Sequence, residues 1–137
     1  MKLIIRTDGG ARGNPGPAGI GVVVEDEKKN VLEEHAKYLG VTTNNQAEYR
    51  AAILGLERAL ALGATSVDVI ADSELLVRQA NGEYKVKNPA LAQRYLELKN
   101  LETQLGGHVK YRHVRREYNT HADKLSNDAM DRGMGRS

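Results

Sequence analysis

The chain has 137 residues, a length that predicts one domain with a core large enough to fold without disulfides or a structural metal. It has no cysteine, which excludes disulfides, zinc–thiolate sites and a cysteine nucleophile. No apolar run approaches the roughly 20 residues of a membrane span, and the N-terminus lacks the apolar segment of a signal peptide. We therefore expect a soluble cytoplasmic protein with no membrane partner.

The net charge is only +2, but the basic residues are unevenly distributed. Nine Lys or Arg and three acidic residues lie between Arg78 and Arg116, which leaves the rest of the chain net negative. A basic stretch beside an acidic remainder favours a polyanionic partner on one face of the protein. A solvated helix with scattered charges explains the same pattern equally well.

In the first half of the chain, short runs rich in Val and Ile predict strands over 2–7, 20–25 and 31–39. The segment that follows, 42–63, is typical of a long helix. Asn44 or Asn45 is its expected N-cap, and Gly63 is its expected C-terminal stop.

The second half continues with alternating elements, and Pro89 is expected in the first turn of its second helix. The order of the elements indicates an α/β fold built on a mixed sheet. No internal repeat or linker divides the chain. The predicted elements are a strand over 66–71, helices over 72–82 and 88–107, a strand over 108–114 and a helix over 119–133.

Four acidic residues stand at unusual positions in this pattern. Asp8 and Asp72 each follow a predicted strand, and neighbouring parallel strands would bring both carboxylates to one edge of the sheet. Glu48 continues the small apolar stripe of the long helix, which should face the sheet. Asp123 lies near the start of the last helix, where the helix dipole alone could justify an acid.

Each of these acids has a structural explanation as a cap or a turn residue, but together they suggest a metal site. Converging carboxylates repel one another unless they are protonated or bridged by a cation. Their oxygens are hard ligands that suit Mg²⁺ or Mn²⁺. Two such ions about 4 Å apart can activate a water and stabilise a leaving oxygen, which is the chemistry of phosphodiester hydrolysis.

Four segments resemble the blocks of type 1 ribonuclease H, in the order and spacing of that family: TDGGARGNPGPAGIGVVV, TTNNQAEYRAAILGL, IADSELLVRQ and NTHADKLSNDA. The resemblance implies an α/β ribonuclease H-like fold with a five-stranded mixed sheet flanked by helices. It implies a free-standing, monomeric catalytic domain over 1–132, with 133–137 as a disordered tail.

The resemblance also implies an activity, which is endonucleolytic hydrolysis of the RNA strand of an RNA–DNA hybrid by two-metal-ion catalysis. The products would carry 5′-phosphate and 3′-hydroxyl ends. The cofactor would be Mg²⁺, two ions per site, with Mn²⁺ as a possible substitute. By the same resemblance, the metal ligands and catalytic acids are Asp8, Glu48, Asp72 and Asp123.

Hybrid recognition requires contacts to the 2′-OH, which polar groups near the acids must supply. The matching family segments assign this substrate contact to Asn14, Asn44, Asn45 and Gln46. Thr43 and Asn88 resemble the pair that holds a phosphate of the DNA strand.

The sequence departs from many members of the family in two places. No Lys-rich handle is inserted between the second and third helices, which lowers the expected affinity for the hybrid. The loop before Asp123 is short, so neither His113 nor His121 matches the family's loop histidine. Arg116 resembles the arginine of short-loop members and is our catalytic candidate there, where a cation would stabilise developing phosphate charge.

Two other functions fit the same sequence. One is a non-catalytic module that binds RNA–DNA hybrids, although degenerate relatives usually lose an acid and all four are present here. The other is a DNA-cutting nuclease on the same fold, which the Asn-rich segment TTNNQAE and the compact length disfavour.

Overall fold

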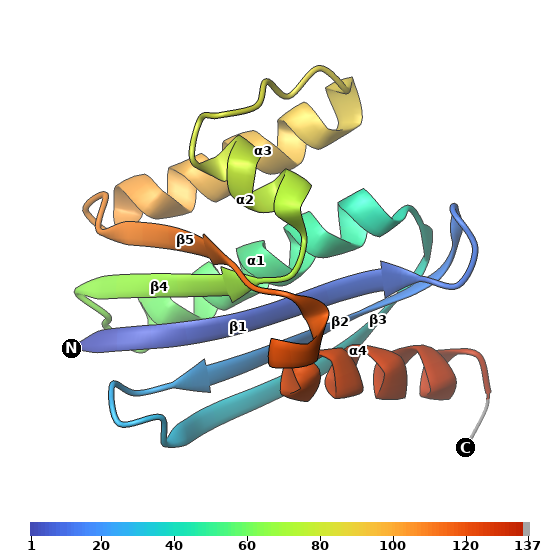
Figure 1. Ribbon diagram of the computed structural model, residues 1–137, viewed down its shortest axis with the longest axis horizontal. Helices are drawn as coiled ribbons and strands as arrows, with labels where there is room; N and C mark the ends of the chain where they lie inside the picture. Colours follow the sequence, from blue (N-terminus) through green and yellow to red (C-terminus); the bar gives the residue numbers. More distant parts are fainter. Residues whose placement is uncertain (136–137) are drawn as a thin grey trace.

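A computed structural model describes residues 1–135, and it contains one five-stranded mixed sheet in the order β3-β2-β1-β4-β5 (Figure 1). β1 pairs antiparallel with β2, and β2 with β3, whereas β4 is parallel to both β1 and β5. This confirms the predicted fold class. The strands are β1 (Lys2–Ala11), β2 (Gly16–Glu25), β3 (Val31–Thr42), β4 (Ser66–Ala71) and β5 (Val109–His113).

Helices cover the two faces of the sheet unequally (Figure 1). On one face α1 (Asn44–Ala61) packs against β1 and β2, α3 (Pro89–Gln104) packs on α1, and α2 (Glu74–Ala80) follows β4. On the opposite face α4 (Thr120–Gly133) crosses β1, β2 and β3, after a short 3₁₀ turn over Arg116–Tyr118. No helix within residues 1–135 combines the length and the apolar character needed to cross a membrane.

β1 is longer than the sequence pattern predicts, because it continues through Gly9 and Gly10 to Ala11. Its parallel pairing with β4 ends at Thr7, but its antiparallel pairing with β2 continues to the Ala11–Ala18 pair. The expectation that Asp8 ends the first strand is therefore wrong. Asp8 lies inside β1, one residue beyond the point where β4 stops, and its side chain emerges at that step in the sheet.

The expected cap of the long helix is also wrong. Thr43 is the N-cap of α1, and its hydroxyl accepts a hydrogen bond from the Gln46 amide at 3.2 Å. Asn44 lies inside the helix by one residue and uses its side chain elsewhere. The expected stop is confirmed, since Gly63 follows the end of α1 with a φ of 77°.

Other boundaries differ by a few residues. β2 begins four residues earlier and β3 ends three residues later than expected, because the two strands pair with each other as far as Gly16 and Thr42. α4 extends one residue past the expected domain boundary at 132, and the amides of Met134 and Gly135 still donate to carbonyls of the last turn. The last part of the expected tail, residues 136–137, lies outside the described residues.

Candidate active site

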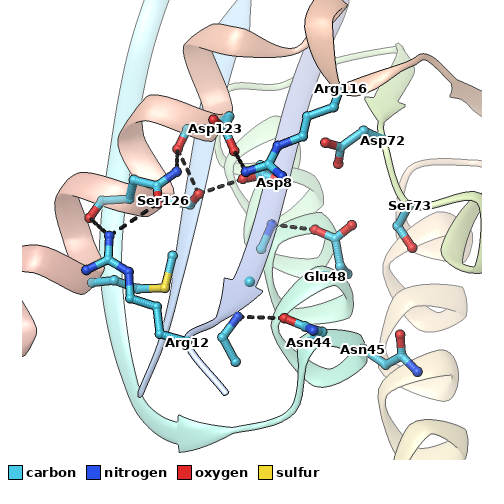
Figure 2. Close-up of a pocket in the computed structure, with 15 residues that line it drawn as sticks. Asp8, Arg12, Asn44, Asn45, Glu48, Asp72, Ser73, Arg116, Asp123 and Ser126 are labelled. Atoms are coloured by element: carbon cyan, nitrogen blue, oxygen red, sulfur yellow. Dashed lines mark hydrogen bonds and ion pairs between the residues drawn. The ribbon is translucent and has the colours of Figure 1, made fainter. Parts of the chain in front are cut away.

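A cleft of about 560 Å³ opens where β1 runs past the end of β4 (Figure 2). It is bounded by α1 on one side and by α4 on the other, so that residues far apart in sequence meet there. The cleft contains all five residues predicted to be catalytic: Asp8, Glu48, Asp72, Arg116 and Asp123.

Three of the four acids form one compact group. Asp8, Glu48 and Asp72 each offer a carboxylate oxygen, and these three oxygens lie within 4.8 Å of one another. Asp8 and Glu48 are only 7% and 9% exposed, whereas Asp72 is half-buried. This separation suits a single divalent cation bound by three hard oxygen ligands.

A glycine allows Glu48 to reach this group. A Cβ atom on Gly9 would overlap the backbone of Ala47, so only glycine lets β1 approach the first turn of α1 so closely. At this contact the Gly9 amide donates a hydrogen bond to Glu48 Oε1 (Figure 2). The Glu48 carboxylate is therefore held against β1.

Burial and mutual repulsion disfavour the charged forms of the two most buried acids. Burial is the main reason that the pKa of Asp8 rises to about 7, and Asp72 and Asp123 raise it further against the lowering effect of the Ser126 hydroxyl. Burial also raises the pKa of Glu48 well above its ordinary value, and the charges of Asp8 and Asp72 add to it. A bound cation would compensate this negative charge, so the donor set fits a divalent metal.

Asp123 lies in the same cleft but outside the three-acid group. Its Oδ1 accepts a hydrogen bond from Arg116 Nη2 at 3.1 Å, and this ion pair raises the pKa of Arg116 above its ordinary value. The Arg116 side chain is 75% exposed, so the guanidinium can also be reached by a ligand in the cleft. The arginine that the sequence analysis singled out thus lies beside the fourth acid.

The predicted substrate-contact residues divide into two sets. Asn44 and Asn45 line the cleft, and Asn44 Oδ1 accepts from the Ala11 amide at 2.7 Å (Figure 2). Asn14, in the loop after β1, accepts from the Asn44 amide at 3.1 Å and so ties that loop to the start of α1. Asn14 and Asn44 are thus linked beside the cleft, and Asn44 and Asn45 line it.

The other three predicted contacts lie outside the residues that line the cleft. Thr43 and Asn88 are the N-caps of α1 and α3, and the Asn88 side chain accepts from the amides of Ala90 and Leu91. Gln46 accepts from Arg94 Nε at 3.0 Å, which joins α1 to α3. Each of these side chains already has a structural partner.

Sequence reasoning missed two buried polar residues next to the acids. Ser126 donates to Asp8 across the interface between α4 and β1 (Figure 2). Asn119 donates from Nδ2 to the Thr7 carbonyl at 2.8 Å, and its buried Oδ1 has no hydrogen-bond partner within the described residues. The only sequence signal for Ser126 was its spacing of three residues from Asp123, which places both on one side of a helix.

The two histidines near the last helix lie where the sequence analysis expected them. His113 is the last residue of β5, and His121 is in the first turn of α4. His121 Nε2 contacts Glu34 of β3, and neither histidine lines the cleft.

The strand order and the acids at the step between β1 and β4 define a protein of the ribonuclease H fold. A family model described as "Reverse transcriptase-like" matches residues 6–129. The chain is 35% identical to "Ribonuclease H" of Lachnoclostridium phytofermentans over 97% of its own length and 94% of that protein's length. The chain therefore belongs to the ribonuclease H family.

Two other similarities are higher in identity. "Bifunctional protein Rv2228c" of Mycobacterium tuberculosis is 48% identical over 96% of this chain, which spans about a third (36%) of that protein's length. Among solved structures, LC11-RNase H1 in complex with an RNA/DNA hybrid is 47% identical, with a TM-score of 0.93 over 96% of this chain and 99% of that chain.

Proposed function

We propose that this protein is an endoribonuclease that hydrolyses the RNA strand of RNA–DNA hybrids. The observation that carries the proposal is the group of three carboxylates, Asp8, Glu48 and Asp72, within 4.8 Å of one another in an open cleft. The RNA/DNA hybrid bound to the similar LC11-RNase H1 supports the same substrate here. A monomeric cytoplasmic enzyme, as the sequence predicts, is part of the proposal.

We further propose Mg²⁺ as the cofactor, two ions per site, with Mn²⁺ as a substitute. Asp8, Glu48 and Asp72 would hold one ion, and Asp8 and Asp123 are the candidates to hold the second. When bound, the two ions would supply an activated water and charge stabilisation at the leaving oxygen, which gives 5′-phosphate and 3′-hydroxyl ends.

The other residues of the cleft have roles that their positions support. Arg116 is an exposed cation beside Asp123 and would compensate negative charge on the scissile phosphate. Asn44 and Asn45 lie at the rim, where their amide groups would meet 2′-hydroxyls in the minor groove of a hybrid. Asn14 holds the backbone of Asn44 and would orient that contact.

A gel assay on end-labelled duplexes of one sequence tests this function. The RNA–DNA, DNA–DNA and RNA–RNA duplexes and the single-stranded RNA are each incubated with Mg²⁺, Mn²⁺ or EDTA. We expect cleavage only of the RNA strand in the hybrid, only with metal, and at least a hundredfold less with Asp72→Asn because a metal ligand is lost.

Asp68→Asn is the matched control, because it removes the same charge four residues before Asp72. Asp68 lies on β4 and is paired with Lys2 at 3.1 Å, whereas Asp72 is the first residue after that strand. The Asp68→Asn variant should cleave the hybrid as fast as the unchanged protein. Full activity of Asp72→Asn would overturn the proposal, and equal cleavage of DNA–DNA and hybrid would reassign it to a DNA nuclease. Tight hybrid binding without cleavage would indicate a binding module.

A further inference from the structure

We propose that Ser126 is a positioning residue for the metal site, because its buried hydroxyl holds the carboxylate of Asp8 in place. The inference rests on the proposed function, and it assigns a role to a residue outside the four acids. Ser126 lies on α4, whereas Asp8 lies on β1, 118 residues earlier in the chain.

The contact is short and sheltered from water. Ser126 Oγ lies 2.5 Å from Asp8 Oδ2, and Ser126 is only 1% exposed. A hydrogen bond from a hydroxyl to a carboxylate is among the stronger types, and burial strengthens it further. One oxygen of Asp8 is thereby fixed, which restricts rotation of the carboxylate that faces Glu48 and Asp72.

The same hydroxyl also lies near a backbone carbonyl of its own helix. Ser126 Oγ lies 2.9 Å from the Asp123 carbonyl, three residues earlier, as is common for serine in helices. A serine hydroxyl has only one proton to donate, and an ionised Asp8 is the stronger acceptor. Asn127 Nδ2 donates to the same Asp123 carbonyl at 2.9 Å, so this carbonyl keeps a partner when Ser126 turns to Asp8.

A glycine in β2 allows α4 to approach Asp8 closely. Asp8 pairs with Gly21 across the β1–β2 ladder, so Gly21 lies directly under α4 beside Asp8. A Cβ atom on Gly21 would overlap the Ala122 carbonyl oxygen and would lie 2.8 Å from the Ser126 amide nitrogen. The absence of a side chain at this position therefore lets α4 come close enough for Ser126 to reach Asp8.

Direct metal binding in the absence of substrate tests this role. The full chain is titrated with Mn²⁺, and the free ion is counted by electron paramagnetic resonance. We expect Ser126→Ala to raise the dissociation constant for Mn²⁺ about tenfold, the usual effect of losing a partner that orients a metal ligand. The Mg²⁺ concentration for half-maximal hybrid cleavage should rise by a similar factor, while kcat at saturating Mg²⁺ changes less than twofold.

Asn127→Ala is the matched control, because it also removes a hydrogen bond to the Asp123 carbonyl but leaves the Ser126–Asp8 contact intact. Its dissociation constant for Mn²⁺ should stay within twofold of the unchanged protein. The inference is overturned if Ser126→Ala binds Mn²⁺ normally, even with a lowered melting temperature, or if both variants lose affinity equally.

The metal titration also separates this inference from the proposed function. If the unchanged protein binds Mn²⁺ and cleaves the hybrid, and Ser126→Ala does both at the same Mn²⁺ and Mg²⁺ concentrations, only the role of Ser126 fails. If the unchanged protein binds Mn²⁺ but cleaves no hybrid, the proposed function fails while the titration still decides the role of Ser126. An unchanged protein that binds no Mn²⁺ contradicts both.

Discussion

Asp8 and Glu48 are buried acids whose charges destabilise the fold when no metal is bound. The pKa of Asp8 rises to about 7 through burial, Asp72 and Asp123, and the pKa of Glu48 is raised by burial and by Asp8. Between pH 4 and 7 the folded protein therefore holds a proton on Asp8 that the unfolded chain has lost. Because the folded state binds more protons, the free energy of unfolding falls as the pH rises through this window.

We expect Asp8→Asn to be more stable than the unchanged protein at pH 8 in EDTA, although it loses activity. The uncharged amide removes the cost of a buried charge beside two other acids, and the melting temperature should rise by roughly 5 °C. The difference should shrink as the pH falls to 5, where Asp8 of the unchanged protein is protonated. Thermal unfolding followed by circular dichroism measures both values.

Asp68→Asn again serves as the control, since Asp68 is partly exposed and paired with Lys2. It should give no increase in melting temperature at pH 8. A metal-free Asp8→Asn protein that melts at or below the temperature of the unchanged protein would show that the charge of Asp8 does not destabilise the fold.

At the scale of elements, an ion pair links the edge strand β3 to α1. Glu33 accepts two hydrogen bonds from Arg58, each 2.8 Å long, and a third from His35 at the same distance. These bonds, with Arg58 first and His35 second, lower the pKa of Glu33 to about 2. The link joins the edge strand of the sheet to the helix that packs on one of its faces, and it lies outside the residues that line the cleft.

The stability that Glu33 contributes is present above its unfolded pKa and is lost as the pH falls through its folded value. Glu33→Gln should therefore lower the free energy of unfolding at pH 7 by about 1 kcal/mol, a modest figure because water screens the half-buried pair. The deficit should persist at pH 5 and close between pH 4 and 2. Urea unfolding at each pH measures it.

Glu27→Gln makes the same charge change in the exposed turn between β2 and β3. It should leave the free energy of unfolding within about 0.5 kcal/mol of the unchanged value, as surface substitutions usually do. A Glu33→Gln deficit that stayed constant down to pH 2 would assign the effect to packing and not to the ion pair.

For the whole molecule, the sequence predicted the order of elements and the fold class because these follow from local hydrophobic periodicity. Strand ends were less predictable, since they depend on the neighbouring strand. β1 continues past Asp8 only because β2 still pairs with it after β4 has ended. Periodicity within β1 carries no information about that step.

The site could be predicted only in part, because some of its residues stand out in the local pattern and others depend on contacts with distant elements. The four acids stood out because each interrupted an apolar or strand pattern, whereas Ser126 and Asn119 are polar residues on an amphipathic helix and at its start. Their importance comes from distances set by Gly21 and by the Thr7 carbonyl, which belong to other elements. The N-cap was misassigned because Thr43, Asn44 and Asn45 are adjacent residues that are all good caps.

The distribution of charge over the molecule makes a prediction about hybrid affinity. Lys85 and Lys87 are exposed in the segment between α2 and α3, next to Asn88, within the 78–116 stretch that carries the excess of basic residues. Some members of the family insert a basic handle there, and these two lysines are the candidates in this segment for contacts with backbone phosphates. Each phosphate contact should contribute about 0.9 to the slope of log K against log salt concentration.

We expect the double change Lys85→Gln, Lys87→Gln to weaken binding of a hybrid in Ca²⁺ and to reduce the magnitude of that slope by roughly 2. The change Lys28→Gln, Lys29→Gln removes the same charge from the β2–β3 turn, at the end of the sheet opposite the β1–β2 loop (Figure 1), and should leave the slope unaltered. Fluorescence anisotropy from 50 to 200 mM salt measures both. If both double variants reduced the slope equally, binding would depend on net charge alone, and the segment between α2 and α3 would have no specific part in holding the hybrid.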